Sequence, residues 1–133
     1  MNYLLDSNAC IVFLNKRSEK LRQRFELCEA EQILLCSVVK AELFYGAMKS
    51  QNPERSLSKV ENFCAHFQSL SFGDKAALSY GKIRAELSAK RQPIGANDFM
   101  IAAIALANNI TLVSHNTREF SRVNGLLLED WEL

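Results

Sequence analysis

The sequence predicts an α/β fold with a central, mostly parallel sheet covered by helices. Short apolar runs of strand length alternate along the chain with longer stretches that have helical periodicity. Strands that alternate with helices usually pair in parallel, because each helix returns the chain to the same edge of the sheet. Asp6 directly follows the first apolar run. It therefore lies at the carboxyl end of a strand, where such sheets bind ligands.

Two strands and four helices are expected in the first half of the chain. A short apolar run at the N-terminus forms the first strand, and the polar residues from Asp6 onward cap the helix behind it. Apolar side chains at helical spacing predict the second helix. Ser37 is expected to cap the third, and Asn52 with Pro53 opens the fourth. The strands are expected at 2–5 and 32–36, and the helices at 9–14, 21–28, 37–49 and 53–67.

Three strands and three helices are expected in the second half. Gly73 and Asp74 turn the chain into a long amphipathic helix. Pro93 and Gly95 indicate a loop, after which Asn97 is expected to cap a strongly apolar helix. The strands are expected at 70–72, 110–113 and 126–128, and the helices at 75–90, 98–109 and 117–120.

The length and composition are those of one globular domain spanning residues 1–133. The chain is 48% hydrophobic and 23% charged, and its longest apolar run is too short to span a bilayer. Its four cysteines lack metal-ligand spacing, so we expect free thiols and a cytoplasmic protein. A formal net charge of +1 says little about nucleic acid, so any attraction to RNA must come from local patches.

Three carboxylates occupy apolar surroundings, which is informative in a chain with only four aspartates. Asp6 ends the first apolar run, Glu42 lies within a largely apolar helix, and Asp98 opens the most apolar helix. A buried carboxylate either takes up a proton or finds a cation. If the three side chains converge at the strand ends, they form a site for a hard divalent cation such as Mg²⁺ or Mn²⁺. Such an ion supports phosphodiester hydrolysis, so the sequence predicts a metal-dependent nuclease.

Each acid has a structural alternative when it is considered alone. Asp6 could simply cap the first helix. Asp98 could interact with a helix dipole, and Glu42 could extend to solvent from the edge of its helix. Their joint occurrence in apolar surroundings favours the metal site.

Four blocks of sequence also resemble, in order, the signatures of PIN-domain ribonucleases of the VapC toxin type. The blocks are LLDSN at 4–8, SVVKAELFYGA at 37–47, IGANDFMIAA at 94–103 and LVSHNTREF at 112–120. The resemblance implies a PIN-like α/β/α sandwich, an Mg²⁺ or Mn²⁺ cofactor, and endonucleolytic cleavage of RNA, with structured loops such as those of tRNA as substrates. It also implies a homodimer that a cognate VapB-type antitoxin neutralises in a hetero-oligomer. Carried over by position, Asp6, Glu42 and Asp98 are the catalytic, metal-binding acids.

Two positions depart from the family pattern. Ser7 replaces a more usual Thr and keeps the hydroxyl, so Ser7 and Asn8 are expected to support the site. Asn116 stands where many PIN domains have a fourth Asp, and its amide oxygen is a weaker, uncharged metal ligand. We therefore expect one well-held ion, with a second arriving with the RNA phosphate. The alternative function is a catalytically silent PIN-like module that binds RNA or protein.

The remaining polar and aromatic candidates are less specific. Tyr45 and Tyr80 are expected to serve core or dimer packing rather than base stacking. His115 is expected to be a bystander, since metal-bound water already provides the base. Basic side chains that could contact RNA are Lys16, Arg17, Lys20 and Arg118.

Overall fold

The sheet has five strands in the order β3-β2-β1-β4-β5, and every neighbouring pair is parallel. The computed structural model describes residues 1–133. The predicted α/β class is confirmed, and the sheet is wholly rather than mostly parallel. The strands are β1 (Tyr3–Leu5), β2 (Ile33–Cys36), β3 (Gln68–Leu70), β4 (Thr111–Val113) and β5 (Leu128–Glu129).

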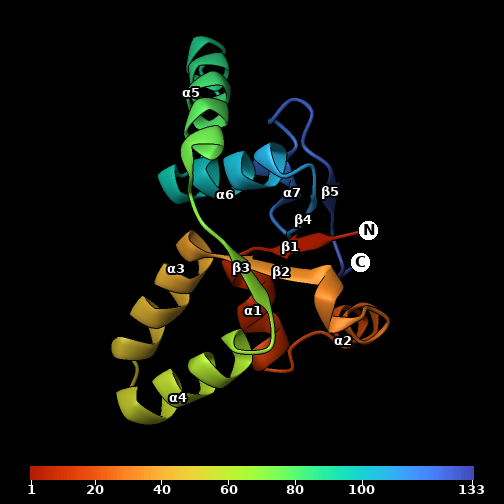
Figure 1. Ribbon diagram of the computed structural model, residues 1–133, viewed down its shortest axis with the longest axis vertical. Coiled ribbons are helices and arrows are strands. Elements are labelled where there is room, and N and C mark those ends of the chain that lie inside the picture. Colours follow the sequence, from red (N-terminus) through yellow and green to blue (C-terminus); the bar gives the residue numbers. More distant parts are fainter.

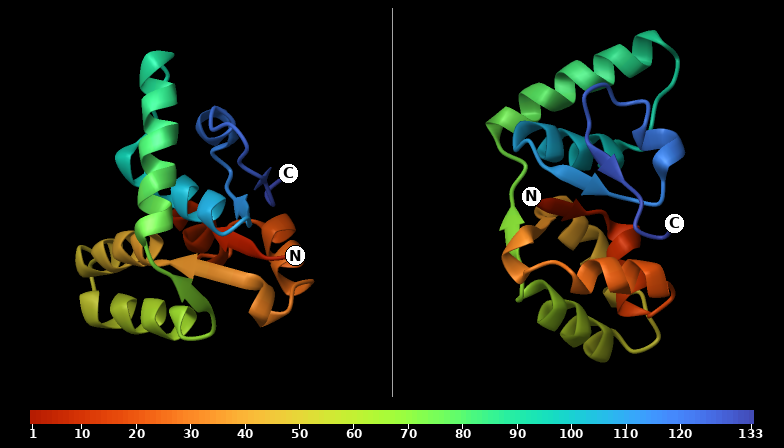
Figure 2. Two further views of the ribbon diagram at one scale, coloured as in Figure 1. Left: turned by 45° about the horizontal axis from the view of Figure 1, so that its top comes forward. Right: turned by 90° about the vertical axis from the view of Figure 1, so that its right-hand side faces the viewer.

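Helices cover both faces of the sheet, as in an α/β/α sandwich (Figure 1). Helices α1 to α4 lie on one side, and α5 to α7 lie on the other (Figures 1 and 2). A short 3₁₀ turn, η1 (Ala30–Gln32), precedes β2. The helices are α1 (Ser7–Leu14), α2 (Glu19–Glu26), α3 (Ser37–Met48), α4 (Pro53–Cys64), α5 (Asp74–Ala89), α6 (Ala96–Ala107) and α7 (Thr117–Phe120).

The three central strands are apolar apart from Thr111, because both of their faces are covered. All residues of β1, β2 and β4 are buried. The edge strands β3 and β5 are partly exposed and more polar. The middle of the sheet is therefore a rigid platform, and the carboxyl ends of β1, β2 and β4 open toward the N-termini of α1 and α3 and the loop before α7.

Helix α6 packs closely on the sheet, as its small residues predict. Ala102, Ala103 and Ala105 are fully buried, and so is Ile104 between them. Short side chains let the helix axis approach the strands, while the larger Phe99 fills the space toward α5. This packing holds the first turn of α6 near the carboxyl end of β1.

Several predicted helix starts were wrong by one or two residues. Helix α1 begins at Ser7 rather than at residue 9, since the Asp6 carboxylate already accepts the amide hydrogen of Ala9. Ser37 is the first residue of α3 rather than its cap, and its hydroxyl donates to the Leu70 carbonyl of β3. Asn97 likewise lies inside α6, because Gly95 occupies the capping position.

The predicted edge strands were displaced by two residues. Strand β3 occupies 68–70 rather than 70–72, and β5 occupies 128–129 rather than 126–128. Pairing of Leu34 with Gln68 and of Leu112 with Leu128 sets these registers. The earlier start of β3 also ends α4 at Cys64 instead of residue 67. Partner strands decide such positions, which local patterns do not specify.

None of the helices combines the length and the apolarity that crossing a bilayer requires. All four cysteines are free thiols, as predicted, and three of them are buried in the core.

Candidate metal centre and its acidic residues

Asp6 is the most rigidly held acid of the candidate site. Its backbone continues β1, donating to the Val113 carbonyl at 3.1 Å, and its side chain caps α1 by accepting from the Ala9 amide at 2.8 Å. The side chain is only 4% exposed. Burial raises the pKa of this carboxyl, while hydrogen bonds from Ser114 and Ala9 act in the opposite direction. Asp6 is thus both a helix cap and a buried acid.

Glu42 reaches the same place from α3. Its Oε1 accepts a hydrogen bond of 2.6 Å from the Ser7 hydroxyl, which joins residues 35 positions apart. The expected support by Ser7 is therefore present in the geometry. Glu42 is half-buried, and its charge contributes to the raised pKa of Asp6. The bond aims the Glu42 carboxylate toward the end of β1.

Asp98 completes the trio from the first turn of α6. Burial is the main cause that raises its pKa to about 6, and the charges of Asp6, Glu119 and Glu42 raise it further. Gly95 makes room for this side chain, since a β-carbon there would lie 3.3 Å from Asp98 Oδ2. All three predicted acids therefore influence one another electrostatically.

A fourth acid, Glu119 of α7, was missed in the sequence. Its charge acts on Asp98, and its Oε2 accepts a 3.2 Å hydrogen bond from the Asn116 side-chain amide. Asn116 is anchored in turn, because its backbone amide donates to Ser114 Oγ at 2.9 Å. The negative charge that Asn116 lacks is thus present one helical turn later. Its i, i+3 spacing from Asn116 in the block 112–120 was the available signal.

No Lys or Arg forms an ion pair with any of these four acids. Burial and neighbouring negative charges raise the pKa of Asp6 and of Asp98, an unfavourable arrangement that a hard divalent ion would relieve. The only three ligand-type side chains with atoms within 4.8 Å of one another are His115, Asp130 and Glu132. The candidate carboxylates are more widely spaced, which suits an ion that keeps several water ligands.

His115 lies beside the acids but is held by the C-terminal segment. Its Nδ1 is 2.9 Å from Asp130 Oδ2 and 3.9 Å from Glu132 Oε2. The hydrogen bond to Asp130 is the main cause that raises the pKa of this imidazole. The His115 ring remains 60% exposed, so the interaction stabilises its orientation without burying it.

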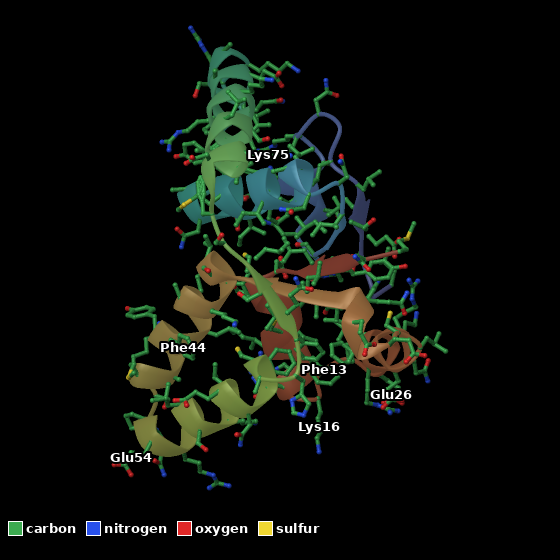
Figure 3. The ribbon with its side chains drawn as sticks, in the orientation of Figure 1. Phe13, Lys16, Glu26, Phe44, Glu54 and Lys75 are labelled. Atoms are coloured by element: carbon green, nitrogen blue, oxygen red, sulfur yellow. The ribbon has the colours of Figure 1, made fainter.

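Most of the predicted RNA contacts lie away from the acids. Helix α1 begins at the site and runs away from it for eight residues, about 12 Å. Lys16, Arg17 and Lys20 follow its far end and are exposed. Figure 3 shows Lys16 there, pointing to solvent. Arg118 is exposed on α7, next to Glu119. The early basic stretch and the acidic centre therefore occupy different ends of α1.

The raised pKa of Asp98 predicts how the stability of the metal-free protein depends on pH. With a pKa of about 6 in the folded protein and 3.8 in the unfolded chain, Asp98 takes up a proton on folding between these two pH values. Its contribution to stability is therefore fully present below pH 4 and is lost as the pH rises through 6. The free energy of unfolding of Asp98→Asn, minus that of the wild type, should increase from pH 4 to pH 6 in EDTA. Urea titrations at each pH measure the two free energies. A difference between variant and wild type that stays constant from pH 4 to pH 6 would show that the pKa of Asp98 is not raised by folding.

The fold and the acidic centre define a class, the PIN domain: the family model described as "PIN domain" matches residues 3–126. The chain belongs to this family and, within it, to the VapC ribonucleases. It is 40% identical over 131 residues to the tRNA(fMet)-specific endonuclease VapC of Salmonella typhimurium, with 98% of each chain covered. It is 39% identical over 133 residues to ribonuclease VapC2 of Rickettsia felis, with 99% of each covered.

The solved structures agree with this assignment. A chain of DNA-bound VapBC from Salmonella typhimurium superposes with a TM-score of 0.92 at 40% identity, and 98% of each chain is covered. The predictions of a PIN fold and of a VapC-type endoribonuclease toxin are therefore confirmed by family membership.

Proposed function

We propose that the domain formed by residues 1–133 cleaves RNA with a divalent cation, Mg²⁺ or Mn²⁺, held by Asp6, Glu42 and Asp98. Glu119 and the amide oxygen of Asn116 complete the ligand set. The observation that supports this assignment is that the charges of Asp6, Glu42 and Glu119, which come from three other segments and form no ion pair with Lys or Arg, act on Asp98. Oxygen donors of this kind select hard cations. A silent binding module would have no need for such a repulsive cluster.

A cation bound there would neutralise the phosphoryl oxygens of the substrate and lower the pKa of a water ligand. The protein's own residues provide rigidity. Asp6 is fixed by its bond from the Ala9 amide, and Glu42 by the Ser7 hydroxyl. Asn116 orients the Glu119 carboxylate. Hydrogen bonds of this kind hold ligands in position and prevent their collapse onto one another.

We further propose tRNA as the substrate and a VapB-type antitoxin as the inhibitor. The support is the name of the Salmonella relative, a tRNA(fMet)-specific endonuclease, and the solved relatives that are VapBC complexes. A homodimer remains a prediction, for which the projecting helix α5 offers exposed Leu78 and half-buried Tyr80 (Figure 1).

The purified protein should cut initiator tRNA at a discrete position in Mg²⁺ and leave it intact in EDTA. Total tRNA separated on sequencing gels measures the cleavage, and the other tRNAs serve as controls for specificity. Adding a cognate VapB-type antitoxin before the tRNA should prevent the cleavage. Equal degradation of all RNAs, or cutting that persists in EDTA, would contradict the proposal.

A further inference from the structure

A hollow of about 520 Å³ opens directly beside Glu42, between the N-terminal turns of α1 and α6 and the exposed side of α3. Its size is in the range of small-ligand sites. Apolar atoms contribute most of its exposed surface, and polar side chains are spread among them. The side chains with hydrogen-bonding or stacking capacity are Ser7, Asn8, Tyr45, Lys49 and Asn97.

Tyr45 and Lys49 form the outer part of this hollow. The Tyr45 side chain is 66% exposed, which corrects the expectation of core packing for this ring. The Lys49 ammonium lies 4.8 Å from the centre of the ring. Lys49 is in no ion pair, so its charge is available to an anion. An exposed aromatic ring with an adjacent cation is the combination that binds single-stranded nucleic acid.

The spacing along α3 connects this pair to the acids. Tyr45 follows Glu42 by three residues and Lys49 follows it by seven, about 4.5 Å and 10.5 Å along the helix axis. A nucleotide bound beside a scissile phosphate at Glu42 would therefore meet the ring first and the ammonium next.

We propose that Tyr45 and Lys49 form a nucleotide subsite next to the scissile phosphate: one unpaired base stacks on the Tyr45 ring, and Lys49 binds the following phosphate. The side-chain amides of Asn8 and Asn97 face the same space and can hydrogen-bond to a base edge or a 2′-hydroxyl. This inference rests on the proposed function, because it names how the RNA enters that site.

The chemistry of the hollow favours RNA over a protein surface. Its lining combines one acid with one lysine, two amides and a hydroxyl, and only three of its nine residues are hydrophobic. An apolar partner would leave these polar groups unpaired. Other basic residues that could serve the same purpose, such as Lys16, lie beyond the far end of α1.

The test uses an RNA fragment that spans the mapped cleavage site and carries 2-aminopurine at one position at a time. Binding is measured by fluorescence in an Asp98→Asn background, which slows cleavage of the RNA during the measurement. The variants are Tyr45→Ala, Tyr45→Phe and Lys49→Gln. Met48→Ala is the matched control, since Met48 is 56% exposed on the same helix but does not line the hollow. Sedimentation of each variant gives its oligomeric state.

Tyr45→Ala should raise the Kd about tenfold and abolish the fluorescence change of the base next to the cut. Tyr45→Phe should keep the Kd and the fluorescence change of the parent, because it keeps the aromatic ring. Lys49→Gln should reduce the slope of log affinity against log salt by about one. A Kd for Tyr45→Ala within twofold of the parent would overturn the subsite. So would an equal loss in Met48→Ala, or a change in sedimenting mass for Tyr45→Ala, since either would assign this surface to contacts between copies. If the wild type cuts no RNA at all, the proposed function has failed, and that result is distinct from failure of the subsite.

Discussion

Replacing Asp98 by Asn is expected to reduce RNA cleavage about 10²- to 10³-fold, which is the usual cost of losing one electrostatic group from a catalytic centre. The substitution keeps the shape of the side chain and removes one negative charge from the acidic centre. Burial and the charges of Asp6, Glu119 and Glu42 oppose that charge in metal-free protein. The variant should therefore fold at least as stably as the wild type without metal, and the loss of activity reports on the site itself.

Initial rates of tRNA cleavage, measured at several Mg²⁺ concentrations, provide the test. Asp74→Asn is the matched control, because Asp74 also lies in the first turn of a helix but is exposed and outside the acidic cluster. It should retain full activity. A thermal melt in Mg²⁺ adds a second readout, since the stabilisation by the ion should be smaller in Asp98→Asn. Comparable rates for wild type and Asp98→Asn would remove Asp98 from the catalytic centre.

Replacing Trp131 by Ala should lower the free energy of unfolding by about 3–5 kcal/mol, a large part of the total for a domain of this size. The indole is only 2% exposed and meets the Tyr3 ring edge-on at 5.0 Å. The Arg24 guanidinium lies over it at 5.1 Å, and its Nε1 donates to Glu129 at 3.0 Å. This residue joins the C-terminus to β1 and α2, so its loss leaves a cavity beside Tyr3 and removes one of the two donors to Glu129 Oε1, the other being Arg24.

Urea unfolding followed by circular dichroism measures the free energy of unfolding. Tryptophan fluorescence is unsuitable, because the substitution removes the only tryptophan of the chain. Trp131→Phe should lower the free energy of unfolding by less than Trp131→Ala, since the phenyl ring keeps most of the apolar contact with Tyr3. Leu133→Ala should change little, because Leu133 is 80% exposed. A loss below 1 kcal/mol for Trp131→Ala would show that the C-terminal segment is not part of the cooperative core.

Local sequence patterns predicted the bounds of an element well where neighbouring residues alone determine them. Strand β1 was expected at 2–5 and is found at 3–5, and α7 was placed correctly at 117–120. Both segments have strong local signals: a continuous apolar run in the first case and a short polar-capped turn in the second. The acids Asp6, Glu42 and Asp98 were selected for the same reason, since a carboxylate in an apolar segment is visible without knowledge of its partners.

Features that depend on contacts between distant segments were not visible in the sequence. Glu119 joins the acidic centre because α7 packs against β5 in a position that brings this side chain within electrostatic range of Asp98. Tyr45 was expected to serve core or dimer packing, and the structure excludes the core, because the exposed side of α3 leaves the ring in solvent beside Glu42. The registers of β3 and β5 were likewise set by their partner strands.

The α/β class, the alternation of elements and the three candidate acids were therefore predictable from the sequence, because each of these is encoded by periodicity or by the cost of burying a charge. Packing between elements decided which further side chains meet those acids. The Ser7 hydroxyl reaches Glu42 across 35 positions of the chain, and the charge of Glu119 on α7 acts on Asp98 of α6. Hydrogen bonds and electrostatic coupling depend on distance in space, and sequence separation does not fix that distance for residues on different elements.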